Sequence, residues 1–296
     1  MYPSIILCPV LDNPELSERA LVSALSQQGL DQLIVLAIDQ GSQAPTRALL
    51  DRLALAHTQL LVWHHAPPLP SLAATWNCGL SFAWGSGADD ALVINNDVEL
   101  PLTYYAQLRA RMQVESLGFL SGVGVDPGQG LGGGDQGEIQ LHPDFSAYVI
   151  TREFHGAFPF DEACIPAYVE DVDAHRRALL ADRGREIGKV NVPFLHYSSG
   201  TLKSVDPQRR AAIERQITEG SRAHYLRKWG GPVNEETFAS PHAGTACTVP
   251  VRTGDLRQVA ERGKSVRAYV FGARLEAAQD EGLRMALAQE AADGPF

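Results

Sequence analysis

Short apolar runs alternate with longer, more polar segments through the first third of the chain. Four of the runs have the length of buried β-strands, at residues 4–10, 32–39, 59–65 and 90–95. Between them lie three segments that we predict to be helices, at residues 13–29, 44–57 and 69–85. Asn13 and Pro14 form a good helix start, since asparagine suits the N-cap and proline the first helical position. The pattern predicts an α/β domain built on a mainly parallel sheet that is flanked by helices.

The remainder of the chain carries fewer regular signals. A strand followed by the start of a helix is predicted at residues 146–155, and a strand with a histidine-bearing turn at residues 186–201. A long helix is predicted at residues 206–231, and residues 255–291 return to a helical composition. We therefore expect two parts, an α/β domain over residues 1–203 and a mainly helical C-terminal extension over residues 204–296.

Residues 121–138 are so rich in glycine that we expect a mobile loop there. They contain a GxGxxG pattern at Gly128, Gly130 and Gly133, but a dinucleotide-binding fingerprint requires a helix to begin at that point. The sequence that follows cannot start a helix, so we reject that motif. A plain surface loop and a lid on the acceptor side of a site both stay open.

The net charge of −10, from 25 basic and 35 acidic side chains, argues against broad docking on DNA or anionic lipid. A local basic patch, or nucleic acid handled as a substrate, stays open. The four cysteines are far apart without a CxxC spacing, which disfavours a disulfide framework or a zinc site and suits a reducing, cytoplasmic compartment. Neither a signal peptide nor an apolar run of about 18 residues, which a membrane span needs, is visible.

Polar side chains follow the ends of three predicted strands. They are Asp12 and Asn13, then Asp39, then Asn95, Asn96 and Asp97. Ligands of such sheets bind at the carboxyl ends of the strands, so these side chains are expected to meet at one edge. An oxygen-rich strand end suits a divalent cation held near phosphates. We favour this interpretation over the alternative that the strand simply ends in a turn.

A second polar cluster places Glu170, Asp171 and Asp173 within four residues, just before an amphipathic segment. Acidic residues at a helix N-terminus are common, because they complement the helix dipole. The functional alternative is a general base whose pKa is raised by the neighbouring carboxylates.

Six motifs occur along the chain in the order CPVLDNPE, IDQGS, TWNCG, INNDVEL, FDEACIPAYVEDVDAHRR and HYSSG. In this order and spacing the chain resembles the inverting GT-A-fold glycosyltransferases of family 2, over about residues 3–200. The segment YLRKWGGP at residues 225–232 resembles an ending found in some bacterial and phage members. The resemblance implies a Rossmann-like GT-A fold and a metal-dependent enzyme that moves a sugar from a nucleoside-diphosphate donor to an acceptor hydroxyl.

The resemblance also implies roles for individual residues. Asp97 and His196 would hold Mn²⁺ or Mg²⁺ across the diphosphate. Asp171 would deprotonate the acceptor in a single displacement that inverts the anomeric centre, and Glu170 would orient a substrate hydroxyl or tune Asp171. Asp39 would accept a hydrogen bond from the nucleobase, for which uracil is favoured although guanine fits as well. The donor-binding residues would be Pro9, Asp12, Asn13, Asp39, Trp76, Asn77, Asn95 and Asn96.

Two positions depart from the pattern of that family. Asn95 stands where the metal-binding DxD triplet begins with aspartate, and Trp76 stands where an arginine usually precedes the asparagine of an ARNxG-like segment. A phosphate-binding cation is therefore missing, and Lys203 or a C-terminal arginine such as Arg227 would have to supply it.

Two rival functions follow from the same residues. A sugar-nucleotide pyrophosphorylase would need a glycine-rich, basic loop near the N-terminus, which is absent from the sequence. A catalytically inactive module that binds nucleotide sugars or glycans is the main alternative, because of Asn95 and Trp76. The acceptor, which could be a carbohydrate, a protein, a small molecule or a modified DNA base, and the formation of a homo-oligomer stay open.

Overall fold

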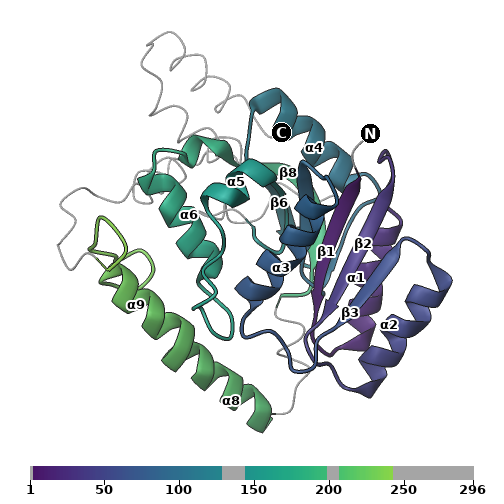
Figure 1. The fold of residues 1–296 in the computed structure, drawn as a ribbon, viewed down its shortest axis with the longest axis horizontal. Coiled ribbons are helices and arrows are strands. Elements are labelled where there is room, and N and C mark those ends of the chain that lie inside the picture. The colour runs from purple at the N-terminus through teal and green to yellow at the C-terminus, as the bar shows by residue number, and fades with distance from the viewer. Residues whose placement is uncertain (1–2, 129–143, 199–206, 243–296) are drawn as a thin grey trace.

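A computed structural model describes residues 3–128, 144–198 and 207–242 of the chain (Figure 1). Its centre is an eight-stranded sheet with the strand order β3–β2–β1–β4–β7–β6–β8–β5. The strands are β1 (Ser4–Val10), β2 (Leu33–Asp39), β3 (Leu60–His64), β4 (Asp90–Ile94), β5 (Val98–Glu99), β6 (Phe119–Val125), β7 (Ala147–Thr151) and β8 (Ile187–His196). The helices are α1 (Pro14–Leu25), α2 (Ala44–Ala56), α3 (Leu72–Gly85), α4 (Tyr104–Glu115), α5 (Arg152–Ala157), α6 (Glu170–Leu180), η1 (Gly184–Glu186), α8 (Pro207–Ile217), η2 (Thr218–Arg222) and α9 (Ala223–Trp229).

The sheet is mixed but largely parallel. Strands β3, β2, β1 and β4 are parallel to one another, and β6 is parallel to β8. Only two of the described strands run the other way: β7 is antiparallel to both β4 and β6, and β5 is antiparallel to β8. The carboxyl ends of the six parallel strands therefore lie along the same edge of the sheet.

Helices cover both faces of the sheet, and each face buries its own apolar core. One core is formed with residues of α1, α2 and α4, and the other with residues of α3, α5 and α6. The parallel strands β1, β2 and β4 are buried on both faces, which explains their nearly continuous apolar sequence. The prediction of an α/β fold with a mainly parallel sheet is confirmed.

The predicted elements of the first 95 residues agree closely with the observed ones. The first helix ends earlier than expected, at Leu25, and the Gln27 side chain binds elsewhere: its Oε1 accepts from the Tyr105 amide at 3.0 Å, and its Nε2 donates to the Pro101 carbonyl at 2.8 Å. The long helix predicted at residues 206–231 corresponds to α8, η2 and α9. Figure 1 shows it as one rod beside α6. The helical composition at residues 255–291 lies outside the described residues.

The prediction of a loop from residue 121 was wrong for its first five residues, which belong to β6. Gly122 and Gly124 are there because of close contacts. A Cβ atom on Gly122 would lie 2.2 Å from the Val192 carbonyl oxygen, and one on Gly124 would lie 2.7 Å from Asp144 Oδ2. Glycine inside a strand commonly marks such a close approach. Most of the GxGxxG pattern lies outside the described residues.

Among the described residues, no helix combines the length and the apolar character that crossing a membrane requires.

Candidate active site

The ends of β1 and β2 are joined by a network of hydrogen bonds. The Ser42 amide donates to Asp39 Oδ1 at 2.8 Å, and the Asp12 amide donates to Ser42 Oγ at 2.9 Å. The Gln43 amide donates to Asp12 Oδ1 at 2.8 Å. Strands β1 and β2 are parallel, with Val10 opposite Asp39, so the predicted site residues Asp12 and Asp39 lie close together at the ends of neighbouring strands.

Asp39 is buried, and its second oxygen, Oδ2, lies 2.8 Å from His64 Nδ1 at the end of β3. Burial alone would raise the pKa of Asp39, but the hydrogen bonds from His64 and Ser42 outweigh burial and lower the pKa. The bond to Asp39 raises the pKa of His64 in turn. Asp39 is therefore held as an ionised acceptor at the carboxyl edge.

The chain reverses sharply after β1. Asp12 and Asn13 both have a φ of +50°, and Asn13 caps α1 by accepting from the Leu16 amide at 3.2 Å. Pro9 comes before this reversal, inside β1, where it is buried opposite Ile38. Asp12 and Asn13 therefore stand at the edge, whereas Pro9 belongs to the strand that supports them.

A cation reaches this edge from the C-terminal helix. Arg209 Nη1 of α8 lies 2.8 Å from Asp12 Oδ2, an ion pair without hydrogen-bond geometry. The sequence had suggested Lys203 or Arg227 for such a cation. Lys203 lies outside the described residues, and Arg227 is on the exposed side of α9. Arg209 was missed because nothing in the sequence shows which turn of a long helix faces the sheet.

The segment Asn95–Asp97 lies between β4 and β5 at the same edge. The Asn95 amide donates to the Ser146 carbonyl at 2.8 Å, and Asn96 Nδ2 donates to Ser17 Oγ on α1 at 3.0 Å. Both asparagines thus hold the turn in place. Asp97, which follows them, is buried.

The short strand β5 brings Asp97 to His196. Val98 pairs with His196 across the antiparallel β5–β8 ladder, and the Tyr197 amide donates to the Asp97 carbonyl at 2.9 Å. As a result His196 Nε2 lies 3.6 Å from Asp97 Oδ1, although the two residues are far apart in sequence. A carboxylate oxygen and an imidazole nitrogen at this separation suit a divalent cation such as Mn²⁺, and Mg²⁺ would rely more on the carboxylate.

Asp144 is a buried carboxylate at this site that the sequence did not reveal. Its Oδ1 accepts from the Ser146 amide at 2.9 Å, and its Oδ2 accepts from the Gly124 amide at 3.2 Å. A Cβ atom on Gly124 would contact both Asp144 Oδ2 and His196 Cβ, so the carboxylate lies close to the histidine. Asp144 follows the glycine-rich segment, where no element could be predicted and no position could be assigned.

Glu170 and Asp171 are the first two residues of α6, and burial raises the pKa of both. For Glu170 the charge of Asp171 adds to this effect, and for Asp171 the charge of Asp144 does. Glu170 is 2% exposed, and its Oε2 has no hydrogen-bond partner among the described residues. Asp171 Oδ1 accepts from the Val172 amide at 2.8 Å.

Two further buried polar atoms near Glu170 and Asp171 lack partners within the described part of the chain, namely Tyr148 Oη and Trp76 Nε1. The rings of Tyr148 and Trp76 meet edge to face at 5.9 Å. Burial raises the pKa of Tyr148, and the charges of Asp171 and Glu170 raise it further. Several unpaired polar atoms in one place are unusual in a folded protein and point to a site for a ligand.

Asp173, the third carboxylate of the cluster, differs from the other two. It is fully buried, but it accepts from Arg177 Nε at 2.8 Å and from Trp229 Nε1 at 2.8 Å. The structure therefore divides the acidic cluster: Asp173 is bonded to side chains of α6 and α9, whereas Glu170 Oε2 has no partner among the described residues and Asp171 Oδ1 accepts only from a backbone amide.

Asn77 and Trp76 have tasks inside the fold. Trp76 is buried in the core and packs on Phe160 with ring centroids 4.8 Å apart. The side chain of Asn77 donates through Nδ2 to the Phe160 carbonyl at 2.8 Å and to Glu162 Oε1 at 3.0 Å. Its Oδ1 accepts from the Phe160 backbone amide at 3.1 Å and from His155 Nε2 at 3.0 Å. An amide side chain has two donor and two acceptor positions, so all four are filled. We therefore leave both residues out of the donor site proposed below.

Comparison with known proteins shows similarity in structure but not in sequence. No protein-family model matches the chain, and no curated protein matches it. The mannosyltransferase PcManGT from Pyrobaculum calidifontis, in complex with GDP-Man and Mn²⁺, has a TM-score of 0.55 and 17% identity, over 99% of this chain and 80% of that one.

Two other solved structures are similar to a comparable degree. Glucosyl-3-phosphoglycerate synthase from Mycobacterium tuberculosis, in complex with Mn²⁺, UDP and glucosyl-3-phosphoglycerate, has a TM-score of 0.52 and 16% identity, over 78% of this chain and 81% of that one. TarS 1–349 from S. aureus, in complex with UDP, has a TM-score of 0.52 and 11% identity, over 98% of this chain and 87% of that one. At such identities the likeness establishes the fold, which is the GT-A fold of these glycosyltransferases.

Proposed function

We propose that this protein is a metal-dependent, inverting glycosyltransferase that moves a sugar from a nucleoside diphosphate to an acceptor hydroxyl. One arrangement supports the proposal: Asp144 lies close to His196 of the Asp97–His196 pair, and its charge raises the pKa of Asp171, which stands next to the buried Glu170. A metal–diphosphate site next to a carboxylate of raised pKa is what glycosyl transfer of this kind requires.

The donor would lie across the ends of β1, β2 and β4. Asp39 would accept from the nucleobase, and uridine is the nucleoside that we favour. Asp12 and Asn13 line the same edge, and Asn95 and Asn96 form the turn that presents the metal pair. The similar structures contain GDP-Man and Mn²⁺ in one case and UDP and Mn²⁺ in another, which supports the class of donor.

The diphosphate needs positive charge, and two sources are available. A divalent cation held by Asp97 and His196 would neutralise the charge on the leaving diphosphate when it is bound. Arg209, paired with Asp12 in the absence of a donor, would exchange that carboxylate for phosphate oxygens. This arginine would replace the cation whose usual place in the sequence is taken by Trp76.

Asp171 would remove the proton from the acceptor hydroxyl. The acceptor oxygen then forms its bond to the anomeric carbon from the face opposite the leaving group, and the bond to the diphosphate oxygen breaks with its electron pair. The raised pKa of Asp171 makes its ionised form a stronger base than an ordinary aspartate. Glu170, kept protonated by burial, would donate a hydrogen bond to another hydroxyl of the acceptor.

The test is release of nucleoside diphosphate from a panel of UDP- and GDP-sugars with Mn²⁺, where water serves as a slow acceptor. We expect release from donors of one nucleotide, and a loss of about 100-fold or more in Asp171→Asn, with binding of the nucleotide retained. Asp89→Asn, an exposed aspartate before β4, is the matched control and should behave as the wild type. Equal release by wild type and Asp171→Asn would refute the assignment of the base. An α-linked donor that gives a β-linked product in NMR spectra would establish inversion.

A further inference from the structure

The two catalytic carboxylates of the proposed site follow a strained turn. Tyr168 and Val169 have φ angles of +74° and +66°, in the left-handed region that residues other than glycine rarely adopt. A β-branched residue such as Val169 is especially disfavoured there. Strain of this kind persists only where the surrounding structure holds it, and Glu170 and Asp171 come directly after it.

The C-terminal helix packs on the loop that leads into this turn. A Cβ atom on Gly220 would lie 2.2 Å from the Ile165 carbonyl oxygen, so only glycine allows the approach. Its neighbour Ser221 donates through Oγ to the Ala167 carbonyl at 2.5 Å. Both residues lie in η2, a short π-helix within the long helix, and such irregularities frequently occur at functional sites.

One lysine of the same helix connects the two ends of the segment 161–173, which contains this loop and the strained turn. Lys228 Nζ lies 2.6 Å from Asp161 Oδ2, before the loop, and 2.7 Å from Asp173 Oδ1, in the first turn of α6. Lys228 is largely buried and Asp173 is fully buried, so this bridge is shielded from solvent. Trp229 Nε1 donates to the same oxygen of Asp173 at 2.8 Å, which gives α9 a second hold on α6.

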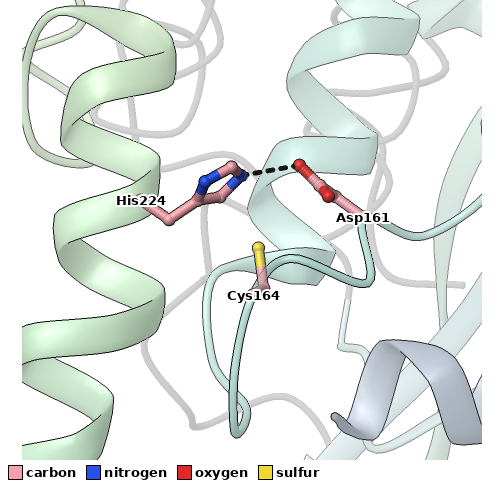
Figure 2. Close-up of side chains that lie close together, drawn as sticks. All are labelled: Asp161, Cys164 and His224. Atoms are coloured by element: carbon pink, nitrogen blue, oxygen red, sulfur yellow. Dashed lines mark hydrogen bonds and ion pairs between the residues drawn. The ribbon is translucent and has the colours of Figure 1, made fainter. Parts of the chain in front are cut away.

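His224 reinforces the bridge from one turn earlier on α9. Its Nε2 lies 2.9 Å from Asp161 Oδ2, as the dashed line in Figure 2 shows. Burial would raise the pKa of Asp161, but the hydrogen bonds from Lys228 and His224 outweigh burial and bring the pKa well below its usual range. Asp161 is therefore an anion held between two groups of the C-terminal helix.

Figure 2 also shows the Cys164 thiol pointing toward Asp161 and His224, and the ligand-type atoms of these three residues all lie within 4.8 Å of one another. Such a set could hold a transition metal. However, the Lys228 ammonium already lies on the Asp161 oxygen that a metal would use. Burial and the charge of Asp161 raise the pKa of Cys164, which keeps the thiol protonated and a poor ligand. The positive charge at this place is supplied by the chain.

We propose that the helix from Pro207 to Trp229 is a positioning element of the active site, in which Lys228 clamps both ends of the strained loop and so fixes Glu170 and Asp171. Lys228 is a positioning residue, since it acts through Asp161 and Asp173. The catalytic role of the two carboxylates rests on the proposed function, but the clamp itself does not.

Hydrogen exchange followed by mass spectrometry tests the clamp without any substrate. In Lys228→Met the amides of residues 161–173 should exchange at least tenfold faster than in the wild type, while those of β1 and β4 keep their protection. The Asp173 amide, which donates to the Val169 carbonyl at 2.8 Å directly after the strained turn, is the most informative probe. Arg215→Met, an exposed cation of α8, is the matched control, and Lys228→Arg should retain most of the protection.

A second readout separates positioning from folding. In Lys228→Met, kcat for nucleotide release should fall at least tenfold and its pH profile should shift, while the affinity for the nucleoside diphosphate stays unchanged. If Lys228→Met does not fold, Ser221→Ala replaces it, since that variant removes only the bond to Ala167.

Three results would overturn the clamp. They are unchanged exchange in residues 161–173, an equal loss of protection throughout the sheet, and stoichiometric bound zinc that disappears in His224→Ala. A wild type that binds no nucleotide but shows the expected exchange would overturn the proposed function and support the clamp.

Discussion

Replacing Glu170 by glutamine should stabilise the protein at neutral and alkaline pH. Glu170 is 2% exposed and one of its oxygens has no partner among the described residues, so its ionised form is poorly solvated. Burial, followed by the charge of Asp171, raises the pKa of Glu170 above its value in the unfolded chain. Glutamine has nearly the same shape but carries no charge at any pH.

The direction of the pH dependence follows from proton binding. Because the folded state binds the Glu170 proton more tightly, this residue contributes stability below its unfolded pKa of about 4.3, and the contribution is lost as pH rises through the folded pKa. Each pH unit between the unfolded pKa and the raised folded pKa removes about 1.4 kcal/mol of this stability. We therefore expect Glu170→Gln to be more stable than the wild type by at least about 2 kcal/mol at pH 8 and by about 0.5 kcal/mol at pH 4.5.

Urea denaturation at several pH values between these limits measures the difference as a change in midpoint at constant slope. Glu219→Gln, on the exposed side of the C-terminal helix, is the matched control and should leave the midpoint unchanged. A Glu170→Gln variant that is less stable at pH 8, or a difference that does not depend on pH, would show that Glu170 is ionised and satisfied in the fold. In that case the site would not contain an acid held neutral at the expense of stability, which is the hallmark of a functional position.

Two other substitutions test separate parts of the structure. Arg209→Met should weaken binding of the nucleoside diphosphate about tenfold, as expected for the loss of one charge-assisted contact of about 1.4 kcal/mol. Binding of the nucleoside alone should be unchanged. Calorimetric titration with both ligands measures the two affinities, and equal weakening of both would place Arg209 away from the phosphates. Gly122→Ala should destabilise the fold by about 1–3 kcal/mol, because the Cβ atom of the alanine would lie 2.2 Å from the Val192 carbonyl oxygen. A thermal or urea midpoint equal to that of the wild type would show that β6 and β8 can separate at this point.

The regular part of the fold follows from sequence because its signals are local. The strands near the N-terminus are continuous apolar runs, and a parallel sheet buried on both faces needs such runs. Helix α4 gave no such signal, since its buried side chains include the adjacent pair Tyr104 and Tyr105, with Arg109 and Arg111 further along. The glycine content of β6 predicts mobility, whereas Gly122 in fact allows a close contact between strands.

Part of the site could also be predicted, because polar residues after parallel strands must meet at one edge. The proximity of Asp97 and His196 is a consequence of the β5–β8 register, and their role as metal ligands stays a prediction. Asp144 and Arg209 could not be found in this way. Each depends on which turn or loop faces the sheet, and that is decided by packing between segments distant in sequence.

A motif position did not by itself show how a side chain is used. Asn77 occupies a place that the family resemblance assigns to the donor, yet all four of its hydrogen-bonding positions are filled within the chain. Asp173 belongs to the same acidic cluster as Asp171, but Lys228 and Arg177 neutralise it. Such differences depend on partners supplied by other elements, so they become visible only in the folded structure.

The most direct test of the central claim is calorimetric titration of the wild type, Asp97→Ala and the control Asp89→Ala with UDP and GDP, with and without Mn²⁺. We predict that one of the two nucleotides binds the wild type and Asp89→Ala in the presence of Mn²⁺, and that this binding is lost with EDTA or in Asp97→Ala. Failure of both nucleotides to bind the wild type, or binding that is independent of Mn²⁺ and of Asp97, would contradict a metal–diphosphate site at the carboxyl edge of the sheet.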